Sequence, residues 1–150
     1  MKILMVCLGN ICRSPLAEGI LADKIAKAGL NWEVDSAGTY GGHAGERADK
    51  RSVKVGLENG IDIKKQRSRQ FRAYDLEAFD IVYAMDSSNL RDITQHAQND
   101  AERAKVKMIM NELNPGENIA VPDPYYGEFG FENVFKMLDK ACDVIIEKYK

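Results

Sequence analysis

The stretch that decides the fold of this chain reads ILMVCLGNICRSP and covers residues 3–15. Its first four residues are all apolar, and a continuous apolar run is typical of a strand buried on both faces of a parallel sheet. Gly9 and Asn10 form a pair that accepts positive φ, which predicts a tight turn. Ser14 and Pro15 favour a helix start, with Ser14 as the cap and Pro15 in the first helical position. The stretch therefore predicts a strand, a loop and a helix in immediate succession.

Two side chains of this stretch indicate anion chemistry. Cys7 ends the predicted strand, and Arg13 follows at the start of the predicted helix. A tight turn between them can direct consecutive backbone N–H groups inward, and the helix N-terminus adds roughly half a positive charge. The guanidinium adds a bidentate fork suited to a tetrahedral oxyanion. The same field favours the thiolate of Cys7 without a histidine base, so the loop predicts an anion site above a cysteine nucleophile.

Cys12 lies in the same turn as Cys7. The turn is tight enough to bring their Cα atoms within disulfide reach, below about 7 Å. Peroxide converts an exposed thiolate first to a sulfenic acid, which a neighbouring thiol captures as a disulfide. Cys12 is therefore a candidate redox partner of Cys7, and the alternative is a small apolar filler. Cys142 falls on the apolar stripe of the last predicted helix and is expected in the core.

Composition narrows the class of protein. The chain has 150 residues, a net charge of −2, 45% hydrophobic and 29% charged residues, which predicts one globular domain over residues 1–150 that does not bind nucleic acid. Its apolar runs are shorter than the roughly 20 residues of a membrane span, and the first is too short for a signal peptide. Three cysteines, an odd number, favour a reducing compartment, the cytoplasm. A monomer is expected, with weak self-association left open.

The rest of the chain alternates between predicted strands and helices. Strands are expected at residues 32–36, 79–85 and 106–110, and helices at 48–59, after residue 86 and at 131–146. The side chains expected to be buried are Leu16, Ile20, Leu21, Ile25 and Ala28 in the first helix, and Val53 and Leu57 in the second. This alternation predicts a parallel sheet with helices on both faces, and ligands of such sheets bind beyond the carboxyl ends of the strands.

Asp123 is a candidate proton donor. It lies between Pro122 and Pro124, which fix the backbone on both sides and favour an extended segment outside any helix. A thiolate that attacks a phosphate monoester expels an alkoxide or phenoxide, and a carboxyl held in one place can supply the proton. Taken alone, a turn residue is an equally good interpretation of this Asp-Pro pair.

The spacing Cys-x5-Arg-Ser-Pro within residues 7–15 resembles the low-molecular-weight protein tyrosine phosphatases, with Gly9 and Asn10 in register. The sequence DPYYG at residues 123–127 resembles the second motif of the same family. The resemblance covers essentially the whole chain. It implies a flavodoxin-like α/β domain with a four-stranded parallel sheet in the order 2-1-3-4.

The resemblance also implies a reaction. Cys7 attacks phosphotyrosine or a small aryl phosphate to form a phosphocysteine, while Asp123 acts first as general acid and then as general base. No cofactor or metal is needed, and phosphate is expected to inhibit as product. The expected phosphate-binding loop consists of Leu8, Gly9, Asn10, Ile11, Cys12, Arg13 and Ser14. The expected supporting residues are Ser36, Asp86 and Asn89, and the expected substrate rim is Tyr40, Gly42, Tyr125 and Tyr126.

Two positions depart from the family pattern. Gly42 stands where the rim loop usually carries a bulky aromatic residue, although Tyr40 is close by. Asn59 stands where many relatives have a histidine, so a histidine that supports the loop is expected to be missing. These departures bear on substrate affinity and on the tuning of the thiol, and leave the chemistry intact.

Three other readings compete. Arsenate reductases of the same fold relay a disulfide through two further cysteines, but residues 65–100 contain no cysteine. Protein-arginine phosphatases carry Thr at the position of Ile11, and a β-branched aliphatic side chain there is expected to suit an aryl ring better than a guanidinium. A non-catalytic phosphate-binding module would lack the nucleophile or the acid, whereas Cys7 and Asp123 are both present.

Overall fold

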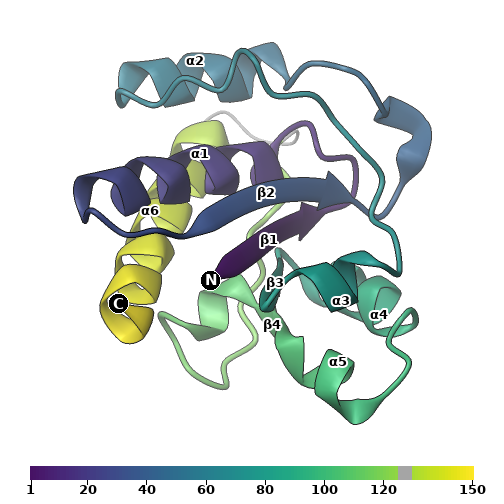
Figure 1. The fold of residues 1–150 in the computed structure, drawn as a ribbon. Helices are drawn as coiled ribbons and strands as arrows, with labels where there is room; N and C mark the ends of the chain where they lie inside the picture. The colour runs from purple at the N-terminus through teal and green to yellow at the C-terminus, as the bar shows by residue number, and fades with distance from the viewer. Residues whose placement is uncertain (125–129) are drawn as a thin grey trace.

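The computed structural model describes residues 1–124 and 130–150 (Figure 1). The strands are β1 (Lys2–Cys7), β2 (Glu33–Gly38), β3 (Ile81–Ala84) and β4 (Val106–Met108). The helices are α1 (Arg13–Lys27), α2 (Lys50–Glu58), α3 (Asp75–Ala78), α4 (Ser87–Thr94), α5 (Asp100–Lys105) and α6 (Gly130–Tyr149). Two single 3-10 turns, η1 (Gly41–His43) and η2 (Ile109–Asn111), follow β2 and β4. Among the described residues, none of the helices is both long and apolar enough to cross a bilayer.

The strands form one parallel sheet in the order β2-β1-β3-β4, which confirms the predicted topology. β1 lies between two other strands, so both of its faces are covered. Ile3, Met5 and Cys7 point toward one hydrophobic cluster, and Leu4 and Val6 toward the other. This double burial is the reason that the strand is continuously apolar instead of alternating.

Helices cover both faces of the sheet, and Figure 1 shows how they divide. α1 and α6 pack together on one face, and α2 packs against these two helices. α3, α4 and α5 lie on the other side of the sheet. The loop from β1 to α1 therefore leaves the carboxyl end of a central strand, which is where parallel sheets bind their ligands.

The structure corrects the predicted start and inner face of α1. The helix begins at Arg13, and Cys12 occupies the N-cap position. Ser14 is not the cap, because its hydroxyl lies within hydrogen-bond distance of Cys7 Sγ instead. Ala28 is exposed at the C-terminal end of the helix, whereas the other four predicted inner residues are buried.

The inner face of α2 was also predicted wrongly. Leu57 is 48% exposed and Val53 only half-buried, while Ser52, Val55 and Gly56 are buried. The reason is that α2 packs on two helices and not on the sheet, so a different side of it is covered. The seven buried positions of α6 include Cys142, which confirms its place in the core.

Candidate active site

The loop after β1 surrounds a cavity of about 240 Å³. Asp123, far along the chain, lines the same cavity, so the structure brings together the two predicted halves of the site. The residues that line the cavity are Cys7, Leu8, Gly9, Ile11, Cys12, Arg13, His43 and Asp123. Tyr125 and Tyr126, the other predicted rim residues of that segment, lie outside the described residues.

Cys7 forms the floor of the cavity. Its side chain is almost fully buried, with 2% of the residue exposed, and it is a free thiol. Sγ lies 3.0 Å from Ser14 Oγ, and the backbone N–H of Asn10 donates to Sγ at 3.3 Å. Asn10 adopts a φ of +57°, the left-handed conformation that turns this N–H back toward the sulfur. Donors at this distance stabilise a negative sulfur.

The Asn10 side chain holds the loop in this conformation. Nδ2 donates to Ser14 Oγ at 2.7 Å and to Ser36 Oγ at 3.0 Å, and Oδ1 accepts from the backbone N–H of Arg69 at 3.0 Å. Left-handed backbone costs a residue with a side chain roughly 1–2 kcal/mol. These three hydrogen bonds inside the protein offset that cost, because breaking them would leave a buried amide without partners.

Neighbouring segments also fix the backbone of the loop. The N–H groups of Thr39 and Tyr40 donate to the carbonyls of Cys7 and Leu8 at 3.0 and 2.8 Å. Ser68 Oγ donates to the carbonyl of Gly9 at 3.0 Å. Gly38 allows this close approach, since a Cβ there would lie 2.7 Å from the carbonyl oxygen of Leu8. These hydrogen bonds hold the backbone of the loop in place.

Arg13 is buried, and an acid at the N-cap of α4 orients it. Its Nη1 donates to Asp86 Oδ2 at 2.8 Å and to the carbonyl of Val121 at 3.0 Å. Asp86 Oδ1 also accepts from the backbone N–H of Asn89 and caps α4. The Asn89 side chain is buried, and within residues 1–124 and 130–150 its Oδ1 has no hydrogen-bond partner. Its backbone N–H contacts Asp86, and the expected support of the loop by its side chain stays a prediction.

Cys12 lines the cavity and is also a free thiol. Burial raises its pKa to about 12, and the negative groups of Asp49, Cys7 and Asp123 act in the same direction. Cys12 is therefore protonated at neutral pH.

The rim of the cavity differs from the sequence-based expectation. Tyr40 is 57% exposed, and its ring meets the His43 ring edge-on at a centroid distance of 6.0 Å. A Cβ on Gly42 would lie 2.2 Å from atoms of the Tyr40 ring, so Tyr40 occupies the space beside the glycine. His43 lines the cavity and was not predicted, although Tyr40 and Gly42 of the same segment were expected at the rim. Its Nδ1 lies 2.6 Å from Glu46 Oε2.

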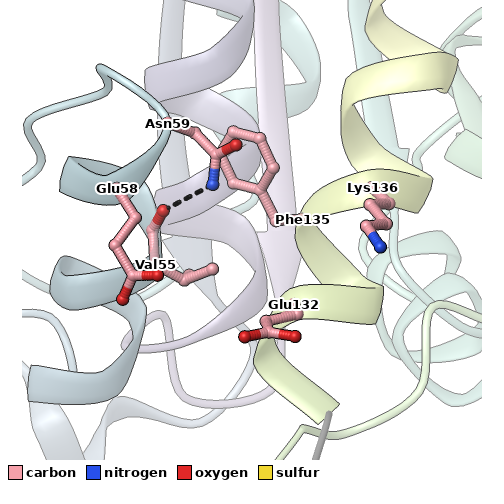
Figure 2. A pocket seen from close by; sticks show the side chains of 6 residues that line it. All are labelled: Val55, Glu58, Asn59, Glu132, Phe135 and Lys136. Carbon is pink, nitrogen blue, oxygen red and sulfur yellow. Dashed lines mark hydrogen bonds between the residues drawn. The ribbon is translucent and has the colours of Figure 1, made fainter.

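A second cavity of about 230 Å³ lies between α2 and α6 (Figure 2). Asn59 lines it and donates from Nδ2 to the carbonyl of Val55 at 2.8 Å. None of the residues that line this cavity belongs to the loop after β1. Asn59 therefore lines a different cavity from the loop, and the effect of the missing histidine on the loop stays a prediction. A residue that the sequence did not reveal, Glu18 of α1, accepts from Ser36 Oγ at 2.6 Å and extends the loop network.

Comparisons with known proteins agree with this geometry. A model of the family "Low molecular weight phosphotyrosine protein phosphatase" matches residues 2–150. The phosphatase of that name from Schizosaccharomyces pombe is 43% identical over 129 residues, which cover 84% of this chain and 81% of that protein. The crystal structure of a protein tyrosine phosphatase from Entamoeba histolytica has a TM-score of 0.92 at 37% identity, covering 99% of this chain and 96% of that one. A Drosophila arginine phosphatase structure also has a TM-score of 0.92, at 31% identity, covering 100% and 98%.

Proposed function

The chain belongs to the low molecular weight phosphotyrosine protein phosphatase family, and we propose that Cys7, Arg13 and Asp123 carry out its protein tyrosine phosphatase reaction. The observation that carries the assignment is the floor of the cavity. A buried sulfur contacts Ser14 Oγ and the Asn10 N–H, and the side chains of Arg13 and Asp123 line the same small space.

The first step transfers the phosphoryl group to the enzyme. The phosphate of the substrate binds over Cys7, where loop N–H groups and the guanidinium of Arg13 stabilise its charge. The thiolate attacks phosphorus, a P–S bond forms and the P–O bond to the aryl ring breaks. Asp123 gives its proton to the departing phenoxide. Asp86 keeps the guanidinium in place throughout, because its carboxylate is already bonded to Nη1.

The second step releases phosphate. The carboxylate of Asp123 takes a proton from water, which attacks phosphorus while the P–S bond breaks. The electrons return to sulfur, and the Ser14 hydroxyl, at 3.0 Å, donates a hydrogen bond to the thiolate that forms. Inorganic phosphate fits the same loop and inhibits as product.

The walls of the cavity favour an aryl substrate. Ile11 and Leu8 line it, and Leu8 is 51% exposed at its mouth. These apolar side chains can pack on the flat face of a tyrosine ring but offer a guanidinium no acceptor. The likeness to an arginine phosphatase structure concerns the fold, which the two activities share.

The test compares substrates directly. Purified enzyme is assayed with a phosphotyrosine peptide, a phosphoarginine peptide of the same sequence and arsenate with thiol reductant. We expect turnover of the phosphotyrosine peptide to exceed that of the other two by at least about a hundredfold in kcat/KM. The control is Cys7→Ser, which should bind phosphate and release none, because an alcohol is a far weaker nucleophile at neutral pH. Preferred turnover of phosphoarginine would overturn the substrate assignment.

Two further parts of the proposal concern the cell. The free thiols of Cys7, Cys12 and Cys142 suit a cytoplasmic protein, since a reducing compartment preserves them. Peroxide is proposed to inactivate the enzyme reversibly, with Cys12 capturing the oxidised Cys7.

A further inference from the structure

A continuous chain of hydrogen bonds joins the sulfur of Cys7 to a carboxyl group on α1. From Cys7 Sγ it passes to Ser14 Oγ at 3.0 Å and on to Asn10 Nδ2 at 2.7 Å. Asn10 Nδ2 also contacts Ser36 Oγ at 3.0 Å, and Ser36 Oγ contacts Glu18 Oε1 at 2.6 Å. Among the described residues, those that line the catalytic cavity do not include Glu18, and the chain of hydrogen bonds connects it to the sulfur.

The direction of each hydrogen bond follows from the chemistry of Asn10. Its Nδ2 can only donate, and its orientation is fixed because Oδ1 accepts from the backbone N–H of Arg69. Ser36 Oγ accepts one amide proton, so its own proton goes to Glu18 at 2.6 Å. Ser14 Oγ accepts the other, so its proton goes to the sulfur. The alternative acceptor for Ser14, the carbonyl of Ala37, is farther away at 3.5 Å.

We propose that Glu18 is a positioning residue whose protonation state, acting through Ser36, Asn10 and Ser14, sets how strongly the loop stabilises the thiolate of Cys7. The proposal rests on the proposed function, in which Cys7 is the nucleophile. The Asn10 amide donates to both serine hydroxyls, Ser14 on the side of Cys7 and Ser36 on the side of Glu18. When Glu18 gains a negative charge it binds the Ser36 hydroxyl more tightly, which draws the Asn10 amide toward Ser36 and weakens its hydrogen bond to Ser14. A neutral Glu18 therefore favours the thiolate and the bound phosphate.

The surroundings of Glu18 place this change near neutral pH. Burial raises the pKa of Glu18 to about 7, against the opposing effect of the hydrogen bond from Ser36. Two other charges act on it: Asp35 of β2 raises the pKa, and Arg69 lowers it. Arg69 is engaged elsewhere, at 3.1 Å from both Asp35 Oδ2 and Asp75 Oδ2, so its charge is shared with two other carboxylates.

The first test follows the Asn10 side-chain amide by NMR in 15N-labelled enzyme without phosphate. In the wild type we expect its two N–H resonances to titrate with a midpoint near pH 7, the value to which burial moves Glu18. In Glu18→Gln, which keeps the acceptor oxygen but cannot ionise, the same resonances should not move. A titration that is unchanged in Glu18→Gln would overturn the proposal.

The second test is kinetic. The inhibition constant of sulfate, an oxyanion whose charge does not change in this range, is measured from pH 5.5 to 8.5, because phosphate and its esters themselves ionise there. We expect the wild type to show a step of about two- to fivefold near pH 7, the change expected when one hydrogen bond in the chain weakens. Glu18→Gln should lack this step. The matched control is Glu58→Gln, which changes a carboxyl of the other cavity and should keep it.

A double mutant separates transmission along the chain from a direct field effect. Ser36→Ala removes the link between Glu18 and Asn10 and leaves both in place. In that background Glu18→Gln should have no further effect on the pH profile or on the Asn10 resonances. An equal effect of Glu18→Gln with and without Ser36 would overturn the proposed route. Activity that survives in Cys7→Ser would instead refute the assigned nucleophile, while the NMR titration, which needs no turnover, would still report on Glu18.

Discussion

Arg13 Nη1 donates to Asp86 Oδ2 at 2.8 Å, and this bond joins the first residue of α1 to the cap of α4. The guanidinium that is proposed to bind phosphate therefore depends on a carboxylate that lies between β3 and α4. Sub-ångström changes at such a contact matter, because the arginine stabilises a charge that grows only in the transition state.

The hydrogen bond between Arg13 and Asp86 predicts that kcat falls when Asp86 is replaced. Asp86→Ala should lower kcat by about ten- to a hundredfold, because Arg13 loses its fixed orientation. Asp86→Asn keeps an oxygen acceptor and the helix cap, so it should lose less than Asp86→Ala. Steady-state kinetics with an aryl phosphate measure both, and Asp92→Asn in the same helix controls for the loss of one negative charge. Equal activity of Asp86→Ala and wild type would show that Arg13 does not need this support.

Asp123 as proton donor predicts a dependence on the leaving group. Asp123→Ala should slow esters of poorly acidic phenols by about 10²- to 10⁴-fold and esters of acidic phenols much less, since a good leaving group needs little protonation. A series of substituted phenyl phosphates measures this under single-turnover conditions. A uniform loss across the series would remove Asp123 from the acid role.

The Tyr40 ring beside Gly42 changes what is expected of the rim. A large side chain at position 42 must displace Tyr40, since even a Cβ would lie 2.2 Å from its ring. Gly42→Trp alone should therefore leave KM for a phosphotyrosine peptide little changed. Tyr40→Ala should raise KM about three- to tenfold with kcat nearly unchanged, and adding Gly42→Trp should restore it. If Tyr40→Ala has no effect on KM, the ring does not contact the substrate.

The place of Cys12 beside Cys7 predicts that a thiol reductant restores the activity of enzyme inactivated by peroxide. Wild-type enzyme inactivated by hydrogen peroxide should recover most of its activity with dithiothreitol, whereas Cys12→Ser should recover much less. Because burial raises the pKa of Cys12 to about 12, capture of the oxidised Cys7 should be faster at pH 8.5 than at pH 6.5. Cys142→Ala is the control for loss of a thiol. Full recovery of Cys12→Ser would make Cys12 a packing residue only.

Glu18 also predicts an unusual dependence of stability on pH. Its folded-state pKa, about 7, lies above the ordinary value of 4.5. The folded protein therefore holds this proton more tightly than the unfolded chain, and the free energy of unfolding falls as the pH rises from about 4.5 to 7. At pH 8 Glu18→Gln should be more stable than wild type by on the order of 2–3 kcal/mol, with little difference at pH 4. Urea unfolding at both pH values measures this, with Glu58→Gln as the control. Parallel stability curves for Glu18→Gln and wild type would contradict it.

The sequence predicted the structural features that depend on a local pattern of residues. The unbroken apolar run before Cys7 correctly predicted a buried strand, and the spacing from Cys7 to Arg13 predicted the loop. Ser14 was misassigned because a serine before proline caps a helix as readily as it binds a neighbouring sulfur. Leu57 was placed inside because periodicity reports that a helix has an apolar face and does not show which partner covers it.

Glu18 could not be found from the sequence for a related reason. On α1 it looks like one more surface glutamate. Its partner Ser36 is on β2, and the pairing of Met5 with Ser36 across β1 and β2 places that hydroxyl beside the loop. Such a contact depends on the register of two strands and the rotation of a helix, which no single stretch of sequence records.

Two hydrogen bonds of the Val121 backbone decide where this chain can tolerate an insertion. Its carbonyl accepts from Arg13, and its N–H donates to the carbonyl of Met85 at the end of β3. The position of Asp123, two residues later, is thus set by Val121 and not by the connection that precedes it. Residues 115–120 are all exposed, so insertions or a fused peptide there can be accommodated without moving the acid. This connection is the natural entry point for a reporter or an affinity label on an enzyme that must stay active.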